Sequence, residues 1–316
     1  MYRKFLIVGF GNIGNRYLQA IQSTKLNCAI YVYDVDKKKY YYGPQKKNIF
    51  YIKNLKQVPN EIDFCFFSSN SNKRLKTIKS ILSIIKSKFI IIEKVLSQST
   101  KDLKEILKFF TKNKMLNKTW VNTHYRTYMI FKKLINNKNK NFILDVDVDG
   151  TNWGLACNSI HYIDLYSSLF NSKVNKIDTS KLDPKWVKSK RKGFYEIYGE
   201  LKVVYKNKKI LKLICKKLNE KNKTNTYHNI RFQNGKYFKI HEEQGKVFSN
   251  FDKNLKFKFD PVSKKMKNFI IDLIKNQKCD LTRVEESVEQ HLILISKLLK
   301  FWNTNHKKKI SNLKIT

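Results

Sequence analysis

The stretch Phe5-Leu6-Ile7-Val8-Gly9-Phe10-Gly11-Asn12-Ile13-Gly14 decides the fold of this chain. A continuous apolar run enters a G-x-G-x-x-G turn, and apolar residues then recur at helical spacing. Gly9 would allow a tight turn, Gly11 would let the backbone approach a phosphate, and Gly14 would bring helix and strand together. The N–H groups and positive dipole end of that helix favour an anion. The pattern predicts a dinucleotide site, although a glycine turn that binds nothing would share this sequence.

A second apolar run, residues 28–33, ends in Asp34, about twenty residues after Gly14. In dinucleotide sites of this kind, an acid at that position binds the ribose hydroxyls. Its negative charge disfavours a 2′-phosphate, so NAD is the expected cofactor. The lysines 37–39 just beyond it leave NADP open.

The formal net charge of +40 would ordinarily point to a nucleic acid or an anionic membrane as partner. Only seven of the 65 basic residues are arginines, so 58 are lysines, and they are spread along the whole chain. This mixture, rich also in Asn, Ile, Phe and Tyr, is typical of an AT-rich genome. Specific contacts to phosphates and base edges rely on arginine. We therefore expect only non-specific attraction to polyanions, and polyanion binding remains a third hypothesis for the function.

Five cysteines are scattered without any CxxC spacing, which argues against a disulfide framework and a structural zinc site. They favour a reducing cytoplasm. No apolar run approaches the length of a membrane span. Residues 145–150 open like a calcium loop, but Ala156 stands where a glutamate is required, so the alternation indicates a strand. We expect a soluble cytoplasmic protein without a membrane partner or a metal.

The pattern of the chain changes near residue 122. Before it, strands alternate with helices, which predicts an α/β domain with a parallel sheet over residues 1–122. After it, successive strands with short turns predict an α+β domain over residues 123–316 with an open, mostly antiparallel sheet. Asn234-Gly235 predicts a hairpin between two of these strands. The basic tail from about residue 304 is expected to be frayed.

Ligands of an open parallel sheet bind beyond the carboxyl ends of its strands. This rule selects the polar groups that follow the fourth and fifth expected strands. Lys94 directly follows an apolar strand and could serve as a general acid/base, although a solvated strand end fits its position equally well. The expected cofactor contacts are therefore Gly9, Phe10, Gly11, Asn12, Ile13, Gly14, Asp34, Ser68, Ser69, Asn70, Glu93 and Lys94.

A second polar cluster falls on an expected helix after Trp153. Cys157, His161 and Asp164 are spaced i, i+4 and i+7, so they share one face. His161 could bond a substrate hydroxyl while Asp164 fixes its tautomer. A core histidine satisfied by a neighbouring aspartate would show the same spacing.

The ordered set of motifs resembles the Gfo/Idh/MocA oxidoreductases. The set comprises the glycine turn, Glu93-Lys94, Val121-Asn122-Thr123-His124-Tyr125-Arg126, His161-x-x-Asp164, and Leu281-Thr282-Arg283-Val284-Glu285-Glu286-Ser287 followed by His291. The resemblance spans nearly the whole chain. It implies an N-terminal Rossmann domain and an NAD(P)-dependent enzyme that acts on a CH–OH group of a sugar, sugar nucleotide or cyclitol, with surface-polysaccharide biosynthesis as one setting.

The same resemblance implies roles for individual residues. Lys94 and His161 are the implied catalytic residues. By analogy, the open sheet face would support a dimer or tetramer. The implied substrate contacts are Tyr125, Arg126, Trp153, Cys157, Asn158 and Asp164.

The chain departs from the family pattern at three places. Val95 replaces the usual proline after Lys94, and Ser68-Ser69-Asn70 replaces Thr-Pro-Asn. Cys157 and Ser159 stand where the family has aspartate and glycine, and a thiol cannot replace a carboxylate as hydrogen-bond acceptor. These departures motivate an alternative, a non-catalytic dinucleotide-binding regulatory protein of the same fold.

Overall fold

The computed structural model describes the chain except for residues 1, 137–142, 219–223 and 251–258. It divides into two compact units. Unit 1 comprises Met1–Ser97, Lys101–Asn122 and Pro261–Val288, and unit 2 comprises Gln98–Thr100, Thr123–Asp260 and Glu289–Thr316. The expected boundary at residue 122 therefore differs in two places. Residues 261–288 belong with unit 1, and residues 98–100 belong with unit 2.

Unit 1 is built on a seven-stranded sheet in the order β16-β6-β5-β4-β1-β2-β3. Its strands are β1 (Arg3–Val8), β2 (Cys28–Tyr33), β3 (Ile49–Tyr51), β4 (Glu61–Phe67), β5 (Lys86–Glu93), β6 (Thr119–Asn122) and β16 (Thr282–Arg283). All pairings are parallel except that of β16 with β6. The predicted parallel sheet is confirmed, and β1 sits between β2 and β4, where the order of strands reverses.

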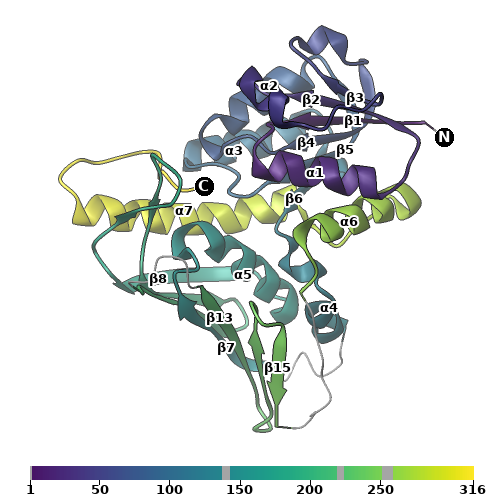
Figure 1. The fold of residues 1–316 in the computed structure, drawn as a ribbon. Coiled ribbons are helices and arrows are strands. Elements are labelled where there is room, and N and C mark those ends of the chain that lie inside the picture. The colour runs from purple at the N-terminus through teal and green to yellow at the C-terminus, as the bar shows by residue number, and fades with distance from the viewer. Residues whose placement is uncertain (1, 137–142, 219–223, 251–258) are drawn as a thin grey trace. The chain divides into compact units, whose positions relative to one another are not determined.

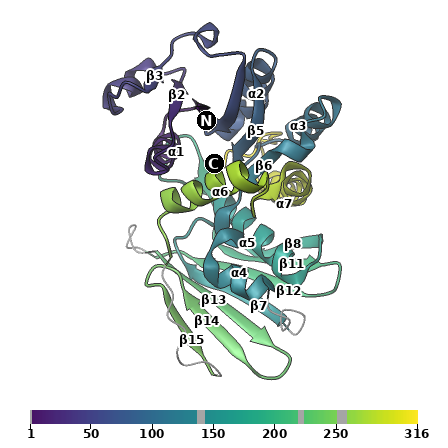
Figure 2. The same cartoon turned by 90° about the vertical axis from the view of Figure 1, so that its right-hand side faces the viewer.

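Helices cover both faces of this sheet. They are α1 (Asn12–Ser23), α2 (Arg74–Leu82), α3 (Thr100–Lys112) and α6 (Val262–Asn276). Short 3₁₀ helices span Lys37–Tyr42, Leu55–Gln57, Ser71–Lys73 and Leu116–Lys118. Helices α1 and α6 lie on one face, and α2 and α3 lie on the other (Figure 1, Figure 2).

Helix α6 explains why residues 261–288 return to unit 1. Its apolar stripe is fully buried and joins one hydrophobic core with α1 and the sheet. The ring of Phe269 packs edge-on against Tyr17 of α1, which stacks on Phe66 of β4. Burying such side chains stabilises a fold by about 1.5–3 kcal/mol each, so the stripe holds α6 on this sheet.

Unit 2 contains a second seven-stranded sheet in the order β15-β14-β13-β7-β12-β11-β8. Its strands are β7 (Ile143–Thr151), β8 (Val174–Leu182), β11 (Gly199–Tyr205), β12 (Ile210–Lys216), β13 (Asn225–Phe232), β14 (Tyr237–His241) and β15 (Lys246–Ser249). A separate ribbon pairs β9 (Val187–Lys188) with β10 (Tyr195–Glu196). The pairings in the large sheet are antiparallel apart from β7 with β12, so the predicted sheet type is confirmed.

The other helices are α4 (Met129–Asn136), α5 (Leu155–Phe170), α7 (Val284–Asn305) and a 3₁₀ turn over His124–Thr127. Helix α5 is almost entirely buried and packs on β12. The hairpin predicted at Asn234-Gly235 joins β13 to β14, with Gly235 at a positive φ of 74°. Residues 145–150 lie in β7, with Val146 and Val148 buried, so the expected strand is confirmed.

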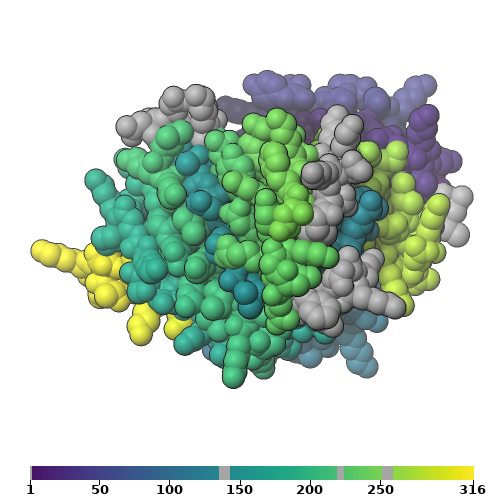
Figure 3. Space-filling view, turned by 90° about the horizontal axis from the view of Figure 1, so that it is seen from below, coloured from purple at the N-terminus to yellow at the C-terminus, as the bar shows by residue number. Residues whose placement is uncertain are grey.

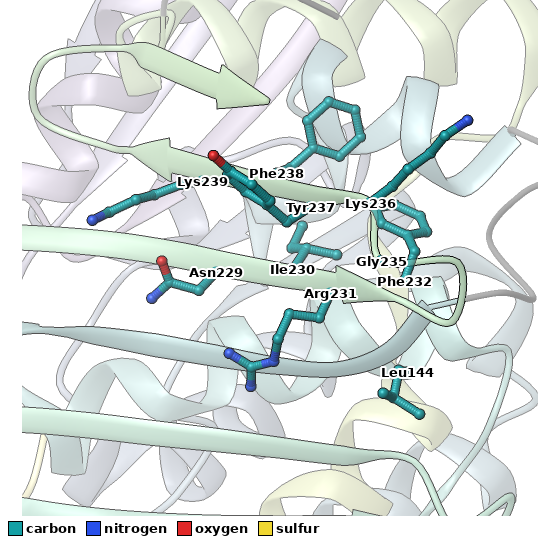
Figure 4. A pocket seen from close by; sticks show the side chains of 10 residues that line it. All are labelled: Leu144, Asn229, Ile230, Arg231, Phe232, Gly235, Lys236, Tyr237, Phe238 and Lys239. Atoms are coloured by element: carbon teal, nitrogen blue, oxygen red, sulfur yellow. The ribbon is translucent and has the colours of Figure 1, made fainter. Parts of the chain in front are cut away.

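Among the residues that the structure describes, no helix lies over the other face of the unit 2 sheet, which we call the open face (Figure 3). Arg231 of β13 bridges Asp145 and Asp147 of β7 there, so this arginine charge is neutralised within the sheet. A hollow of about 410 Å³ lies around Arg231. Figure 4 shows Leu144, Tyr237 and Lys239 among the side chains that line it.

The C-terminal tail, which was expected to be frayed from about residue 304, is instead anchored in unit 2. Leu313 and Ile315 are buried, and Lys314 between them is exposed. The backbone of Leu313 donates to the Gln98 carbonyl at 2.8 Å, and Tyr195 donates to the Lys314 carbonyl at 2.8 Å. The two apolar side chains supply the burial that a purely basic tail would lack.

All five cysteines are free thiols. Burial raises the pKa of Cys215 to about 11 and that of Cys279 to about 12. Among the described residues, no helix combines the length and the apolar character needed to cross a membrane.

Candidate functional site

The glycine turn lies at the point of unit 1 where the strand order reverses. Gly9 has a φ of +97°, and a Cβ there would lie 2.5 Å from the backbone nitrogen of Ser69. A Cβ on Gly14 would lie 2.1 Å from the Gly9 carbonyl oxygen. A Cβ on Gly11 would meet no protein atom within 4 Å. Gly9 and Gly14 are therefore required by packing, whereas Gly11 faces open space.

Helix α1 begins without a side-chain cap. Its N-cap residue is Gly11, and the first turn carries no acidic residue. No side chain caps the first N–H groups of this 12-residue helix. These groups and the positive end of the helix dipole lie next to the open space at Gly11. Such an end favours an anionic group, so the turn fits a pyrophosphate.

Asp34 follows β2 and is only 4% exposed. Its Oδ2 accepts from the backbone N–H of Phe10 at 2.6 Å and from Lys39 Nζ at 2.9 Å. Its Oδ1 accepts from the backbone N–H of Asp36 at 2.8 Å. A carboxylate offers about four acceptor positions, so capacity for a ribose hydroxyl remains. Lys39 nevertheless offsets much of the charge that disfavours a 2′-phosphate.

Ser68, Ser69 and Asn70 follow β4 beside the glycine turn. The Ser68 hydroxyl donates to the Gly9 carbonyl at 2.6 Å and so braces the turn. Asn70 is the N-cap residue of the 3₁₀ helix Ser71–Lys73. These residues therefore border the same carboxyl edge of the sheet as Gly9.

Glu93 ends β5 and is buried inside unit 1. Its Oε1 accepts from the Tyr17 hydroxyl at 2.5 Å and from Asn122 Nδ2 at 2.6 Å. Burial raises the pKa of Glu93, and these two hydrogen bonds oppose the rise, as do the charges of Arg74 and Lys94. The Glu93 carboxyl therefore belongs to an internal network that ties β5 to α1 and β6.

Arg74 holds the backbone on both sides of Lys94. Its guanidinium is buried and donates to the carbonyls of Glu93 and Val95, and also to the carbonyl of Ser69. The peptide bond between Lys94 and Val95 is cis. Sequence reasoning missed Arg74. The available signal was an arginine at the start of a helix in a chain that otherwise uses lysine.

In unit 2, the cluster predicted on α5 is partly brought together. His161 is buried, and its ring lies 4.8 Å from that of His124 and 5.0 Å from that of Tyr125, centroid to centroid. Arg126 donates from Nε to Asp164 Oδ2 at 2.9 Å, and from Nη2 to Oδ1. Asp164 is thus the bidentate partner of Arg126. This ion pair fixes the 3₁₀ turn over His124–Thr127 to α5, the helix that carries His161.

Cys157 lies in the first turn of α5 with a carboxylate nearby. Its thiol lies 3.7 Å from the Gly154 carbonyl oxygen. Asn158 donates to the Trp153 carbonyl at 2.6 Å. Glu196 of β10 accepts from the backbone N–H of Ala156 at 2.8 Å. A Cβ on Gly154 would lie 3.3 Å from Cys157 Sγ and 3.3 Å from Glu196 Oε1, so both groups border Gly154. Sequence reasoning missed Glu196, because this carboxylate comes from a different element than Cys157.

No protein-family model and no curated protein matches this chain. Solved structures do share its fold. Myo-inositol dehydrogenase from Lactobacillus casei, in complex with NAD(H) and myo-inositol, has a TM-score of 0.69 at 15% identity, covering 100% of this chain and 98% of that one. The WlbA dehydrogenase from Bordetella pertussis, in complex with NADH and UDP-GlcNAcA, has a TM-score of 0.71 at 13% identity, covering 96% of both chains.

Biliverdin reductase from Synechocystis sp. PCC 6803, in complex with biliverdin and NADP⁺, has a TM-score of 0.71 at 10% identity, covering 93% of this chain and 98% of that one. Identities this low establish the fold alone. The expected fold, a parallel sheet with helices on both faces together with a second, mostly antiparallel sheet, is therefore confirmed.

Replacing Arg74 with methionine should lower the free energy of unfolding by about 3 kcal/mol, because three buried carbonyls lose charged donors. Arg74→Lys should recover only part of this loss, since one ammonium cannot reproduce the planar fork of donors. Urea unfolding measures both. The exposed neighbour Lys76, changed to methionine, is the control and should stay within about 0.5 kcal/mol of the original protein. Equal stability of Arg74→Met and Lys76→Met would contradict the assigned role.

Proposed function

We propose that this protein is an NAD(P)-dependent oxidoreductase that acts on a hydroxyl or ketone of a sugar, sugar nucleotide or cyclitol. The proposal rests on the groups that the structure gathers at the carboxyl edge of the unit 1 sheet. The start of α1 at Gly11, the acceptor Asp34, and Lys94 each follow the carboxyl end of a different strand of this parallel sheet, namely β1, β2 and β5. Arg74 holds the carbonyls on both sides of Lys94. Nucleotide cofactors bind at this edge in open α/β sheets.

The N–H groups at the start of α1 would hold the pyrophosphate, and Asp34 would accept from the adenosine ribose. Bound there, a nicotinamide supplies two-electron redox chemistry. We take NAD as the cofactor because Asp34 carries a negative charge. Its ion pair with Lys39 keeps NADP as the alternative.

Lys94 is the proposed acid/base. In the oxidative direction, its amine would accept the proton of the substrate hydroxyl while the carbon gives up a hydride, which leaves a ketone. In the reductive direction, its ammonium would return the proton. A general acid/base of this kind contributes about 10²–10⁴-fold to the rate.

Residues of unit 2 are the proposed substrate contacts. His161 would share a hydrogen bond with a substrate hydroxyl, and the ring of Tyr125 would contact the substrate. Two of the solved structures with this fold hold polyhydroxylated molecules, myo-inositol and UDP-GlcNAcA. They support a polyol or sugar-nucleotide substrate. Surface-polysaccharide biosynthesis is the setting that we propose for a sugar-nucleotide substrate.

The alternative function, a regulator that binds the dinucleotide without catalysis, is favoured by Cys157. A thiol there is a weak acceptor where a carboxylate would be a strong one. The two proposals differ in the chemistry they expect of Lys94, and they share the cofactor site.

A dimer is the proposed assembly. The open face of the unit 2 sheet exposes large apolar side chains on three strands, namely Leu144 at 50%, Tyr237 at 43% and Phe248 at 52%. With Arg231 neutralised by Asp145 and Asp147, this face is suited to burial against a second copy.

Gly11→Ala should keep the fold and lose the cofactor. The added methyl meets no protein atom within 4 Å, yet it fills the space where a phosphate would approach the backbone. We expect an unchanged melting temperature and at least about tenfold weaker NADH binding by fluorescence titration. NADPH titrated in parallel decides the cofactor preference.

Gly14→Ala is the matched control for the turn. Its Cβ would lie 2.1 Å from the Gly9 carbonyl, so both stability and binding should fall. NADH affinity in Gly11→Ala equal to that of the original protein would place the dinucleotide elsewhere.

Lys94→Met should lower substrate-dependent cofactor reduction by about 100-fold or more, because the acid/base is lost. NADH binding should fall far less than this rate. The assay follows absorbance of the reduced nicotinamide across a panel of polyols and sugar nucleotides. The exposed Lys76→Met serves as control and should retain full activity. Cofactor binding without turnover of any substrate in the panel would favour the regulator.

Light scattering should give a mass of about twice the 37.7 kDa of the chain. Phe248→Lys should shift the protein toward the monomer, because a charge would enter an apolar interface. A mass of one chain at every concentration would exclude the dimer.

A further inference from the structure

Glu242 directly follows β14, and its carboxylate reaches into unit 2. It accepts three side-chain hydrogen bonds. Oε1 accepts from the Tyr162 hydroxyl at 3.0 Å and from His228 Nε2 at 2.6 Å, and Oε2 accepts from the Tyr125 hydroxyl at 2.9 Å. These partners come from three different elements: α5, β13 and the 3₁₀ turn over His124–Thr127. One carboxylate therefore ties three parts of unit 2 together.

The chemistry of the network fixes the direction of its bonds. An ionised carboxylate only accepts, so His228 must carry its proton on Nε2 and both tyrosines must donate. His228 Nδ1 lies 2.7 Å from the Tyr166 hydroxyl, which donates to it when the imidazole is neutral. Burial, reinforced by the charge of Glu242, raises the pKa of Tyr125 and Tyr162 well above the ordinary value. Both phenols therefore remain donors.

The network reaches the residue proposed to contact the substrate. The ring of Tyr125 lies 5.0 Å from the ring of His161 and 5.1 Å from that of Tyr162. Its hydroxyl is anchored to Glu242. The Glu242 carboxylate therefore fixes the hydroxyl end of Tyr125, and with it the position of the Tyr125 ring relative to His161.

The adjacent glutamate provides a contrast within the same hairpin. Glu243 accepts from the backbone N–H of Thr226 at 2.8 Å and from its hydroxyl at 2.9 Å, and lies 3.4 Å from His241. It makes as many contacts as Glu242, yet none of them involves Tyr125, Tyr162 or His228. Comparing substitutions of the two glutamates therefore distinguishes an effect on the stability of the hairpin from an effect on the surroundings of His161.

We propose that Glu242 is a positioning residue of the substrate site, which holds Tyr125 against His161 by accepting from its hydroxyl. This inference rests on the proposed function, because that proposal makes His161 and Tyr125 substrate contacts. A glutamine at residue 242 has only one acceptor oxygen, and its amide group cannot accept from the second donor site. Such a substitution would release either Tyr125 or the Tyr162–His228 pair.

The test uses the imidazole NMR signals of the full-length protein, which contains six histidines. Glu242→Gln should shift the signals of both His228 and His161. Tyr125→Phe, which keeps the ring and removes only the anchored hydroxyl, should shift His161. Glu243→Gln should leave the His161 signal in place. Signals are assigned by replacing single histidines with asparagine.

A shift of His228 alone in Glu242→Gln, with His161 unmoved, would show that the carboxylate serves only the interior of the unit and would overturn the proposal. If Glu242→Gln does not fold, Tyr125→Phe decides by itself. An unmoved His161 signal in that variant also overturns it. These readouts need neither substrate nor cofactor, so they stand apart from the turnover assay.

With a substrate that the protein turns over, Glu242→Gln should lower kcat/KM by about tenfold or more, because the Tyr125 ring would no longer be held in place. Glu243→Gln should change kcat/KM less than about twofold. Equal losses in the two variants would assign the effect to the hairpin as a whole and contradict a positioning role.

Discussion

A single buried guanidinium holds the part of unit 1 on which the proposed chemistry depends. Arg74 donates to the carbonyls of the residues before and after Lys94. It also donates to the carbonyl of Ser69, which follows β4. Ser69 in turn packs against Gly9, where no side chain would fit. The glycine turn and the backbone on both sides of Lys94 are therefore linked through one arginine.

In unit 2, too, charged side chains that are largely shielded from solvent are held by hydrogen bonds from other elements. Asp164 is fully buried and is matched by Arg126, and the carboxylate of Glu242 is matched by His228 and two phenols. Burial of such groups is costly unless every donor and acceptor is used. The pairing holds His161 and Tyr125 in a defined arrangement. In the first turn of the same helix, Glu196 accepts from the backbone N–H of Ala156, the residue before Cys157.

Sequence reasoning could find what local rules encode. The apolar run into Gly9, the alternation of Val146 and Val148, and the Asn234-Gly235 turn each predict one element, and the structure contains all three. The return of α6 to unit 1 and the anchoring of Leu313 depend on partners far away in the sequence. The same holds for Arg74, Glu196 and Glu242. Their partners lie on other elements, so their roles depend on contacts that local sequence patterns do not reveal.

We propose that the edge of the unit 1 sheet holds a nicotinamide dinucleotide. A crystal structure of the protein soaked with NAD⁺ tests this most directly. We expect pyrophosphate density over the N–H groups that begin α1, with a ribose hydroxyl within hydrogen-bond distance of Asp34. An empty glycine turn at saturating NAD⁺, or a dinucleotide bound away from Asp34, would contradict it.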